Sequence, residues 1–234
     1  MSSQLAVVGL GRTGYAEALA IQRAIAHARI DGTVSRDVLL LVEHPPVVTI
    51  GRSAKNEYGS TPREFLKAQG VELYEVERGG DVTYHGPGQL VGYTIYDLNE
   101  HKQDLHWFLR QIEESIIVAV SAFGITGGRR EGYTGVWVQD RKLASIGIHI
   151  KQWVSWHGFA LNVATDLSYF DMIVPCGIAN VEMTSVRKEL GARAPADVWG
   201  RTLDQIVSGF STVFQQAPQV LTLDDLGVSP LVKD

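Results

Sequence analysis

Short runs of apolar, β-branched residues alternate along this chain with longer stretches in which apolar positions recur at helical spacing. Residues 5–10 form an apolar run that predicts a first strand, and residues 15–30 show the periodicity of an amphipathic helix. Two β-rich runs follow at 38–42 and 47–50, with two consecutive prolines between them. Because proline has no backbone N–H to donate to a strand ladder, we expect the chain to bend or the first strand to end there.

Capping residues set the boundaries of further helices. Thr61 and Glu64 form a capping box around Pro62, which predicts a helix that begins there and ends near Gly70. Asp104 is expected to cap a second, longer helix. The pattern predicts the end of that helix at about residue 123, further helices near 184–190 and over 196–215, and strands at 71–76, 91–96, 135–138, 143–150 and 154–163, with 135–138 and 143–150 forming a hairpin.

Strands outnumber helices in the middle of the chain, and several are joined by hairpins. This pattern predicts an α+β fold with a mixed, mostly antiparallel sheet and flanking helices. The run at 9–14 superficially matches the dinucleotide-binding pattern Gly-x-Gly-x-x-Gly, but it lacks the acidic residue about 20 positions further on. No linker-like segment divides the chain, so we expect one domain, with little structural signal beyond Ala217.

Composition and charge narrow the class of protein. The 234 residues are 45% hydrophobic and 20% charged, with a formal net charge of −5, which argues against a general nucleic-acid binder. A single cysteine cannot form an internal disulfide, which fits a reducing compartment. The N-terminus has no basic segment followed by a long apolar run, and no apolar stretch is long enough to cross a bilayer. We therefore expect a cytoplasmic protein that does not bind membranes.

The only cysteine, Cys176, lies between Pro175 and Gly177. This setting predicts a constrained loop, where reactive groups are often presented, although a buried and inert thiol is the alternative. A nucleophilic thiol needs a partner that favours the thiolate, and both a histidine and Lys142 are candidates. A Cys–His pair would indicate a hydrolase.

Lys142 itself has two interpretations. If residues 142–148 are extended, Lys142 shares one face of the strand with Ala144, Ile146 and Ile148, where desolvation would help the amine act as a base. The alternative is a solvated lysine in a hairpin turn, which is the commoner role for a residue at such a position.

A glycine-rich run occupies residues 78–89, in which four of the twelve residues are glycine. Arg78 can pair a carboxylate or a phosphate, but no Gly-Lys-Ser/Thr follows the glycines, which argues against a P-loop. His44 and His157 are interpreted as structural histidines. Because no histidine or cysteine spacing typical of a metal site occurs, we expect no metal.

Five ordered motifs give this chain a specific resemblance. It resembles the octanoyl-[acyl carrier protein]:protein N-octanoyltransferases of lipoate biosynthesis over residues 5–216. The motifs that carry the resemblance are Glu43-His44-Pro45 with Thr49-Ile50-Gly51-Arg52, the whole glycine-rich run 78–89, Arg141-Lys142-Leu143-Ala144-Ser145-Ile146-Gly147, His157-Gly158-Phe159-Ala160-Leu161-Asn162, and Ile173-Val174-Pro175-Cys176-Gly177-Ile178.

The resemblance implies a fold, a mechanism and a site. The fold would be that of the biotin and lipoate-protein ligases, with residues 1–217 as a single catalytic domain and 218–234 as a C-terminal tail. Cys176 would carry an octanoyl thioester, and Lys142 would be its acid/base partner. The residues implied to bind substrate are Arg78, Gly79, Gly80, Asp81, Val82, Thr83, Tyr84, His85, Ser145, Ile146, Gly147, Gly158, Phe159 and Ala160.

The resemblance also implies partners and excludes a cofactor. The donor would be octanoyl-acyl carrier protein, and the acceptor would be a lysine on an apo lipoyl domain of a 2-oxoacid dehydrogenase complex or of the glycine-cleavage H protein. Neither ATP nor a metal would be required. The alternatives are an ATP-dependent lipoate-protein ligase on the same fold, a Cys–His hydrolase, and a lipoyl-domain binding module without catalytic activity.

Overall fold

The structure is a computed structural model that describes residues 4–54, 63–173 and 181–228. Its elements in chain order are β1 (Gln4–Arg12), α1 (Tyr15–Ile30), β2 (Asp37–Glu43), β3 (Val47–Ile50), α2 (Arg63–Ala68), β4 (Glu72–Glu75), β5 (Val82–His85), β6 (Gln89–Ile95), α3 (Leu105–Ser121), β7 (Gly128–Arg130), β8 (Tyr133–Val138), β9 (Arg141–Lys151), β10 (Val154–Asn162), α4 (Val186–Leu190), α5 (Val198–Phe214) and β11 (Ala217–Val220), with a 3₁₀ helix, η1 (Leu167–Met172), after β10.

A mixed eight-stranded sheet forms the centre of the molecule, in the order β11-β1-β2-β6-β10-β9-β8-β7. β1 runs parallel to both β11 and β2, and the remaining neighbours are antiparallel. β9 and β10 form a long hairpin in which Lys151 lies opposite Val154. The predicted α+β fold with a mostly antiparallel sheet is therefore confirmed.

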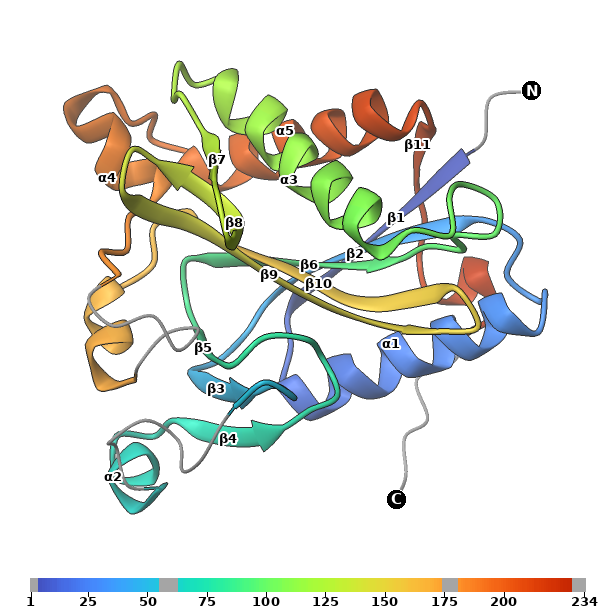
Figure 1. The fold of residues 1–234 in the computed structure, drawn as a ribbon, viewed down its shortest axis with the longest axis horizontal. Coiled ribbons are helices and arrows are strands. Elements are labelled where there is room, and N and C mark those ends of the chain that lie inside the picture. The colour runs from blue at the N-terminus through green and yellow to red at the C-terminus, as the bar shows by residue number, and fades with distance from the viewer. Residues whose placement is uncertain (1–3, 55–62, 174–180, 229–234) are drawn as a thin grey trace.

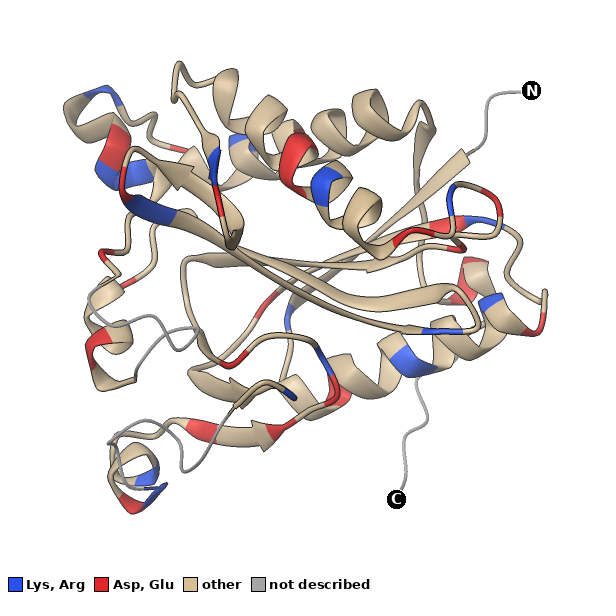
Figure 2. Ribbon diagram, in the orientation of Figure 1, with Lys and Arg blue, Asp and Glu red and all other residues tan. Residues whose placement is uncertain are grey.

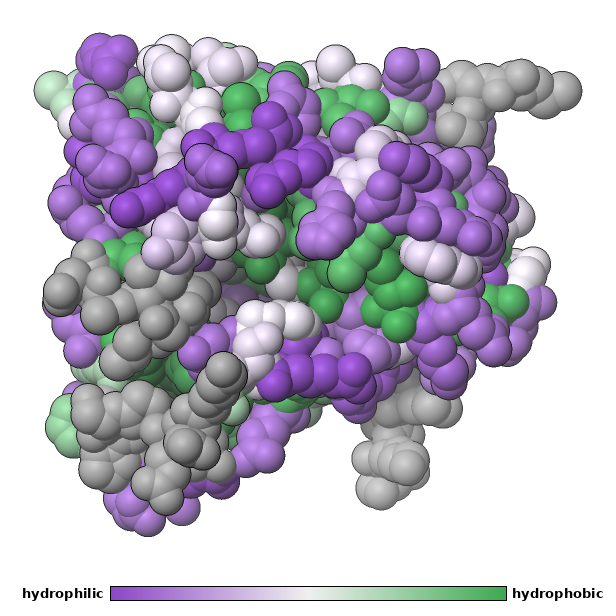
Figure 3. Space-filling view, viewed as in Figure 1, coloured by the Kyte–Doolittle hydropathy of each residue, from purple (hydrophilic) through white to green (hydrophobic). Residues whose placement is uncertain are grey.

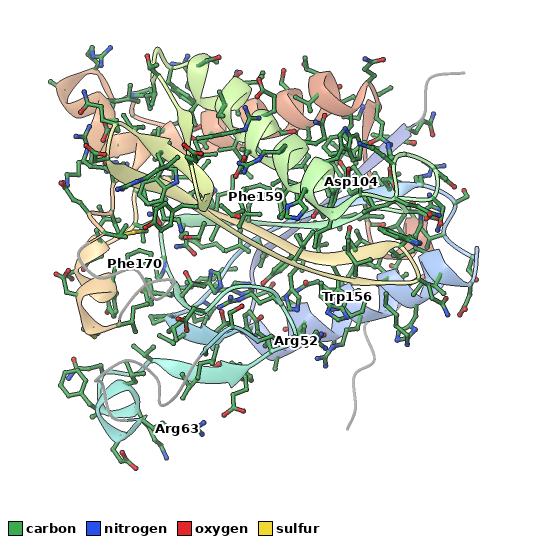
Figure 4. All side chains as sticks on the ribbon, viewed as in Figure 1. Arg52, Arg63, Asp104, Trp156, Phe159 and Phe170 are labelled. Atoms are coloured by element: carbon green, nitrogen blue, oxygen red, sulfur yellow. The ribbon has the colours of Figure 1, made fainter. Side chains whose placement is uncertain are left out.

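Helices cover both faces of this main sheet. Figure 1 shows α3 and α5 packed together on one face and α1 on the other. The alternation of side chains along each strand separates the two cores: in β10, Phe159 packs with the α3/α5 core, whereas Trp156 packs with the α1 core. Figure 4 labels both aromatic side chains, one on each side of the sheet.

A second, three-stranded sheet lies on the α1 side of the main sheet, in the order β4-β3-β5 (Figure 1). β2 and β3 are consecutive in the chain but belong to different sheets, because the chain bends at 44–46 as the two prolines predict. The small sheet has a core of its own, in which Val48, Leu66 and Tyr84 pack against Phe170 of η1.

Most predicted elements match the structure, but the strands β5, β7 and β11 were not predicted. The helix over 15–30 is confirmed with its bounds, and Asp104 caps α3 by accepting a hydrogen bond from the backbone N–H of Trp107 at 3.0 Å. Part of the glycine-rich run forms the strand β5, although the pattern predicted only a loop there. β11 extends the main sheet beyond residue 217, in a region where the sequence gave little indication of regular structure. Thr61 and Pro62, which were predicted to start a helix, lie outside the described residues.

Charged and apolar residues are separated on the surface. In Figure 2 the charged residues lie on the helices, in loops and toward strand ends, whereas the middle of the main sheet carries almost none. Figure 3 shows a band of apolar residues across the centre of the same face, between hydrophilic margins. Within the described ranges, no helix is both long enough and apolar enough to span a bilayer.

We expect Gly209→Ala to destabilise the fold without changing the α1 side of the sheet. A Cβ at position 209 in α5 would overlap the backbone carbonyl oxygen of Ser115 in α3 and lie 3.4 Å from Ala119 Cβ, so the two helices would have to separate. Overpacking of this kind costs about 1–3 kcal/mol in the free energy of unfolding, measured by urea denaturation. Gly128→Ala, whose Cβ meets nothing within 4 Å, is the matched control, and equal stabilities of the two variants would contradict this account.

Candidate functional site

A cavity opens between the main sheet, the N-terminus of α1 and the glycine-rich segment. It encloses about 460 Å³ including its open mouth. Its walls come from five parts of the chain that are far apart in sequence. The lining residues are Tyr15, Arg78, Gly80, Asp81, Thr83, His85, Val91, Tyr93, Ser145, Ile146, Gly147, His157, Gly158, Phe159 and Ala160.

The strand β5 divides its side chains between the cavity and the core of the small sheet. Thr83 and His85 line the cavity, whereas Val82 and Tyr84 point the other way into the core with Phe170. This is the two-residue alternation of a strand. Of the substrate-binding residues that the sequence predicted in this segment, the structure therefore brings Thr83 and His85 to the cavity but not Val82 or Tyr84.

Arg78 is buried and holds the glycine-rich segment in shape. Its guanidinium donates to the backbone oxygen of Thr49 at 2.7 Å, to Thr49 Oγ1 at 2.9 and 3.2 Å, and to the backbone oxygens of Gly79 at 3.0 Å and Asp81 at 2.8 Å. The sequence suggested that Arg78 pairs a carboxylate or a phosphate. The structure shows that its N–H groups also fix the loop around them.

Two glycines face each other where the hairpin strands meet the glycine-rich segment. Gly147 of β9 pairs with Gly158 of β10. A Cβ on Gly147 would lie 2.6 Å from the backbone oxygen of Gly79, and the backbone N–H of Gly79 donates to the oxygen of Ile148 at 2.8 Å. Backbone lies directly on backbone here, which only glycine permits. Gly79 itself does not line the cavity, but its contact brings Gly80 and Asp81 to the cavity wall.

A β-bulge determines which way Lys142 faces. Val136 pairs with Ala144 and Trp137 pairs with Lys142, so Leu143 is an extra residue in β9. Leu143 and Ala144 both pack in the α3/α5 core, as do Val136 and Val138 of β8. Lys142 and Trp137 consequently lie on the opposite face. The prediction that Lys142 shares a face with Ala144, Ile146 and Ile148 is wrong, because it assumed unbroken alternation.

Lys142 is also not a solvated turn lysine, since only 2% of it is exposed. Its backbone N–H donates to the oxygen of Glu182 at 2.8 Å, and its own oxygen accepts from the N–H of Thr184 at 2.9 Å. Met183 thereby forms a parallel bridge with Lys142. Cys176, seven positions before Met183 (183 − 176), lies in the segment 174–180, outside the described residues.

A continuous chain of hydrogen bonds joins Arg78 to the backbone of Lys142. Thr49 Oγ1 accepts from Arg78 and lies 3.4 Å from His85 Nε2. His85 Nδ1 donates to Gln89 Oε1 at 2.8 Å, and Gln89 Nε2 donates to Asn162 Oδ1 at 3.0 Å. Asn162 Nδ2 then donates to the backbone oxygen of Thr184 at 3.0 Å, and Thr184 bonds to Lys142.

The imidazoles beside the cavity are held in their neutral form. Burial lowers the pKa of His44 to about 4, and burial together with the neighbouring His44 lowers the pKa of His85 to about 3. His44 Nδ1–H donates to the backbone oxygen of Thr13 at 2.7 Å, so its Nε2 accepts from the hydroxyl of Tyr93 at 2.6 Å. Burial also raises the pKa of Tyr93 well above its usual value of 10. His85 and Tyr93, which line the cavity, and the neighbouring His44 are therefore uncharged near neutral pH.

His157 departs from the regular geometry of its strand. Its φ of +60° is in the left-handed region, and its backbone N–H donates to Gln22 Oε1 of α1 at 3.1 Å. Such strain inside a strand is typical of functional positions. The side chain turns toward Glu77, with Nε2 3.8 Å from Oε1, and burial lowers the pKa of the imidazole.

Glu77 connects α1 to the segment that precedes the cavity wall. Its carboxylate accepts from Arg23 Nη2 at 2.7 Å and Nε at 3.0 Å, and from Trp156 Nε1 at 2.8 Å. His157, Arg23 and Trp156 together hold the pKa of Glu77 far below its usual range.

The structure gathers most of the predicted site residues and adds four. Eleven of the fourteen predicted substrate-binding residues line the cavity; Gly79, Val82 and Tyr84 do not. Their roles in binding stay a prediction. Sequence reasoning missed Tyr15, Val91, Tyr93 and His157. Val91 and Tyr93 lie two residues apart in a predicted strand, and this spacing was the signal that their side chains share one face. His157 was interpreted as structural. In the described part of the chain, no cluster of three or more His, Cys, Asp or Glu side chains could hold a metal ion.

Comparison with known proteins decides the family. The family model "Lipoyl protein ligase A/B catalytic domain" matches residues 14–207. An octanoyltransferase from Solibacter usitatus is 47% identical over 205 residues, which cover 88% of this chain and 90% of that protein. This chain belongs to the octanoyltransferase family. A second member, the octanoyltransferase of Myxococcus xanthus, is 43% identical over 90% of this chain, although the match spans only 59% of that relative's length.

Solved structures agree with this family's fold. Lipoate-protein ligase A bound with ATP superposes with a TM-score of 0.76 at 18% identity, covering 97% of this chain and 92% of the ligase. The putative lipoate protein ligase Ta0514 of T. acidophilum, with bound lipoic acid, gives a TM-score of 0.74 at 16% identity over 97% of this chain and 93% of that one. The predicted biotin/lipoate-ligase-like fold is confirmed, and at these identities the likeness establishes the fold alone.

The buried imidazoles predict acid sensitivity. Because the folded pKa values of His44 and His85 lie below the unfolded value of about 6.5, the unfolded chain binds more protons as the pH falls, and stability declines below pH 6.5. Each histidine should cost roughly 2 kcal/mol at pH 5. We expect His44→Gln to reduce the pH dependence of the free energy of unfolding between pH 7 and 5, measured by urea denaturation. The exposed His106→Gln is the control, and an unchanged slope in His44→Gln would contradict the account.

The depressed pKa of Glu77 predicts a further loss of folding stability, at lower pH. Its folded pKa is depressed, so its stabilisation is present above the unfolded value of 4.5 and is lost as the pH falls toward the folded pKa. Glu77→Gln should lower the free energy of unfolding by about 1–2 kcal/mol at pH 7, and the difference from the wild type should shrink below pH 4.5. Glu75→Gln, which breaks an exposed ion pair with Arg63, should cost under ~0.5 kcal/mol. A Glu77→Gln deficit that does not change with pH would rule out the ionic contribution.

Proposed function

We propose that this protein transfers an octanoyl group from octanoyl-acyl carrier protein to a lysine of apo lipoyl domains, in the pathway of lipoate biosynthesis. The observation that carries the proposal is the 47% identity to a curated octanoyltransferase across 88% of the chain. The proposed acceptors are the lipoyl domains of 2-oxoacid dehydrogenase complexes and the glycine-cleavage H protein. The proposed reaction needs neither ATP nor a metal.

In the first half of the proposed reaction, Cys176 becomes acylated. Its thiol gives a proton to Lys142 Nζ, and the thiolate attacks the carbonyl carbon of the donor thioester. The bond from that carbon to the carrier's sulfur breaks, and the carrier thiolate takes the proton from Lys142. One thioester replaces another, so no activation by a nucleotide is needed. The burial of Lys142 on the cavity face of β9 supports this role.

In the second half, the acceptor lysine amine attacks the carbonyl carbon of the Cys176 thioester. A C–N bond forms, the C–S bond breaks, and the amine proton passes through Lys142 back to the sulfur. The product amide is more stable than the thioester, which drives the transfer forward. Because acylation and transfer are separate steps, the proposal predicts ping-pong kinetics.

The cavity is proposed to hold the acyl chain. Ser145 follows Lys142 by three residues, which is about 10 Å along a strand, and an extended eight-carbon chain has a similar length of roughly 10 Å. Val91 and Ala160, which pack on the α1 face of the sheet, supply apolar wall to the cavity. Each buried CH₂ contributes about 0.8 kcal/mol to binding, so discrimination between neighbouring chain lengths should be graded.

The other expectations from the sequence also stand as proposals. We propose that residues 1–217 form one catalytic domain, and that β11 joins the start of the C-terminal segment 218–234 to its sheet. A location in the cytoplasm is proposed from the single cysteine.

The decisive experiment supplies octanoyl-acyl carrier protein and an apo lipoyl domain without ATP. We expect octanoylation of the acceptor lysine, detected by intact mass, and a hydroxylamine-labile adduct on the enzyme that Cys176→Ser abolishes. Activity only with free octanoate and ATP would establish a ligase instead. Release of free octanoate without an acceptor would indicate a hydrolase, and binding of the lipoyl domain without turnover would indicate a binding module.

Lys142→Ala tests the proposed proton transfer. We expect kcat/KM to fall by roughly 100-fold or more, because a positioned acid/base group contributes that much, and we expect iodoacetamide to alkylate Cys176 more slowly near neutral pH because the thiolate fraction falls. Lys151→Ala, which removes an exposed lysine from the same strand, is the matched control and should behave as the wild type. Equal alkylation rates in Lys142→Ala and the control would remove Lys142 from this role.

A further inference from the structure

Trp137 forms the wall against which the Lys142 side chain lies. The Lys142 Nζ is 5.4 Å from the centroid of the Trp137 ring, within the range of a cation–π interaction. Only 2% of Trp137 is exposed, and it pairs with Lys142 across β8 and β9. An ammonium beside a desolvated indole face interacts more strongly with the ring than one at an exposed site.

A glycine two residues before Trp137 leaves room for the lysine stem. Gly135 adopts a φ of +135°, and a Cβ at this position would lie 3.0 Å from Lys142 Cε. The alternating residue of β8, Val136, points to the other face and packs in the α3/α5 core. Gly135 and Trp137 therefore form two sides of a slot, and the bulge at Leu143 turns Lys142 into it.

The ring face of Trp137 is the part of the indole that contacts positive charge. Trp137 Nε1 is buried and has no hydrogen-bond acceptor among the described residues. A second cation, the guanidinium of the exposed Arg130, lies 5.2 Å from the same ring. The side chain thus contacts positive charge from two residues.

We propose that Trp137 is a positioning residue that holds the Lys142 ammonium over its indole face. This inference rests on the proposed function, in which Lys142 receives the proton of the Cys176 thiol. By stabilising the protonated amine, the ring favours the state in which Cys176 is a thiolate. The slot also fixes Nζ in one place, so that the same amine can return the proton to the leaving sulfur.

Three variants test the proposal through a readout that needs no acyl transfer. Iodoacetamide alkylation of Cys176 is measured as a function of pH in Trp137→Leu, Trp137→Phe and Trp199→Leu. Trp137→Leu should slow alkylation at pH 7 by roughly 3- to 30-fold, because the lost cation–π interaction is worth up to about that factor. Trp137→Phe keeps a ring face and should lose much less. Trp199, a half-buried residue of α5 packed against the core away from the cavity, is the control for removal of an indole.

The shape of the pH profile separates positioning from simple packing. If the ring stabilises the ammonium, Trp137→Leu moves the rising limb of the alkylation profile, which follows thiolate formation, to higher pH. It moves the limb of the kcat/KM profile that Lys142 governs to lower pH, and both limbs stay in place in Trp137→Phe. A uniform drop at every pH, equal to that of Trp199→Leu, would overturn the proposal. Wild-type alkylation kinetics in Trp137→Leu would overturn it as well.

A spectroscopic measurement on the wild type covers the case in which Trp137→Leu does not fold. With ¹³C-labelled lysine, the ε-methylene resonance that disappears in Lys142→Arg should lie upfield of the other lysines, because it sits over the indole ring. An unshifted resonance would overturn the proposal. Failure of the wild type to transfer octanoate without ATP would instead contradict the proposed function, and would leave the alkylation and NMR results to decide the geometry.

Discussion

The contact of the Gly79 backbone with Gly147 positions everything around the cavity. It joins the small sheet to the main sheet at a point where neither chain carries a side chain, and the N–H of Gly79 completes it by donating to Ile148. Were the two backbones one side chain further apart, Asp81, Thr83 and His85 would move away from the β9–β10 hairpin. The cavity is therefore a consequence of how closely two backbones can approach, and its lining residues depend on that separation.

Buried polar groups connect the two sides of this contact. Arg78, Thr49, His85, Gln89 and Asn162 form one hydrogen-bonded chain that ends at the backbone beside Lys142. Buried polar groups are costly unless each has its partner, so replacement of any member leaves its neighbours unsatisfied. The glycine-rich segment and the strand that carries the lysine are thus held in one arrangement.

Local patterns predicted the elements of this fold well, because burial on a sheet or helix face has a period that can be read from residue types. The helix over 15–30 and the hairpin strands are examples. The sequence failed where long-range contacts decide the conformation. β5 was missed because glycines precede it, and β11 because a short exposed edge strand has almost no pattern. Within the site, the direction of Lys142 could not be derived, since residue types do not indicate a bulge. The left-handed φ of His157 could not be derived either, because a positive φ is uncommon for any residue other than glycine.

Because Leu143 is an extra residue in β9, the direction of the Lys142 side chain depends on the number of residues in the strand and on the bulge, as well as on side-chain identity. If the bulge were lost while every residue was kept, strict alternation would return, Lys142 would share the face of Ala144, and the amine would point beneath α3 and α5 although every motif residue survived. A related chain that is one residue shorter here would form a regular ladder and would still turn its lysine to the face of Trp137, because the lysine would directly precede the residue that matches Ala144. Insertions and deletions in this strand, which are easily overlooked beside substitutions, are the first thing to check before the same reaction is assigned to a distant relative.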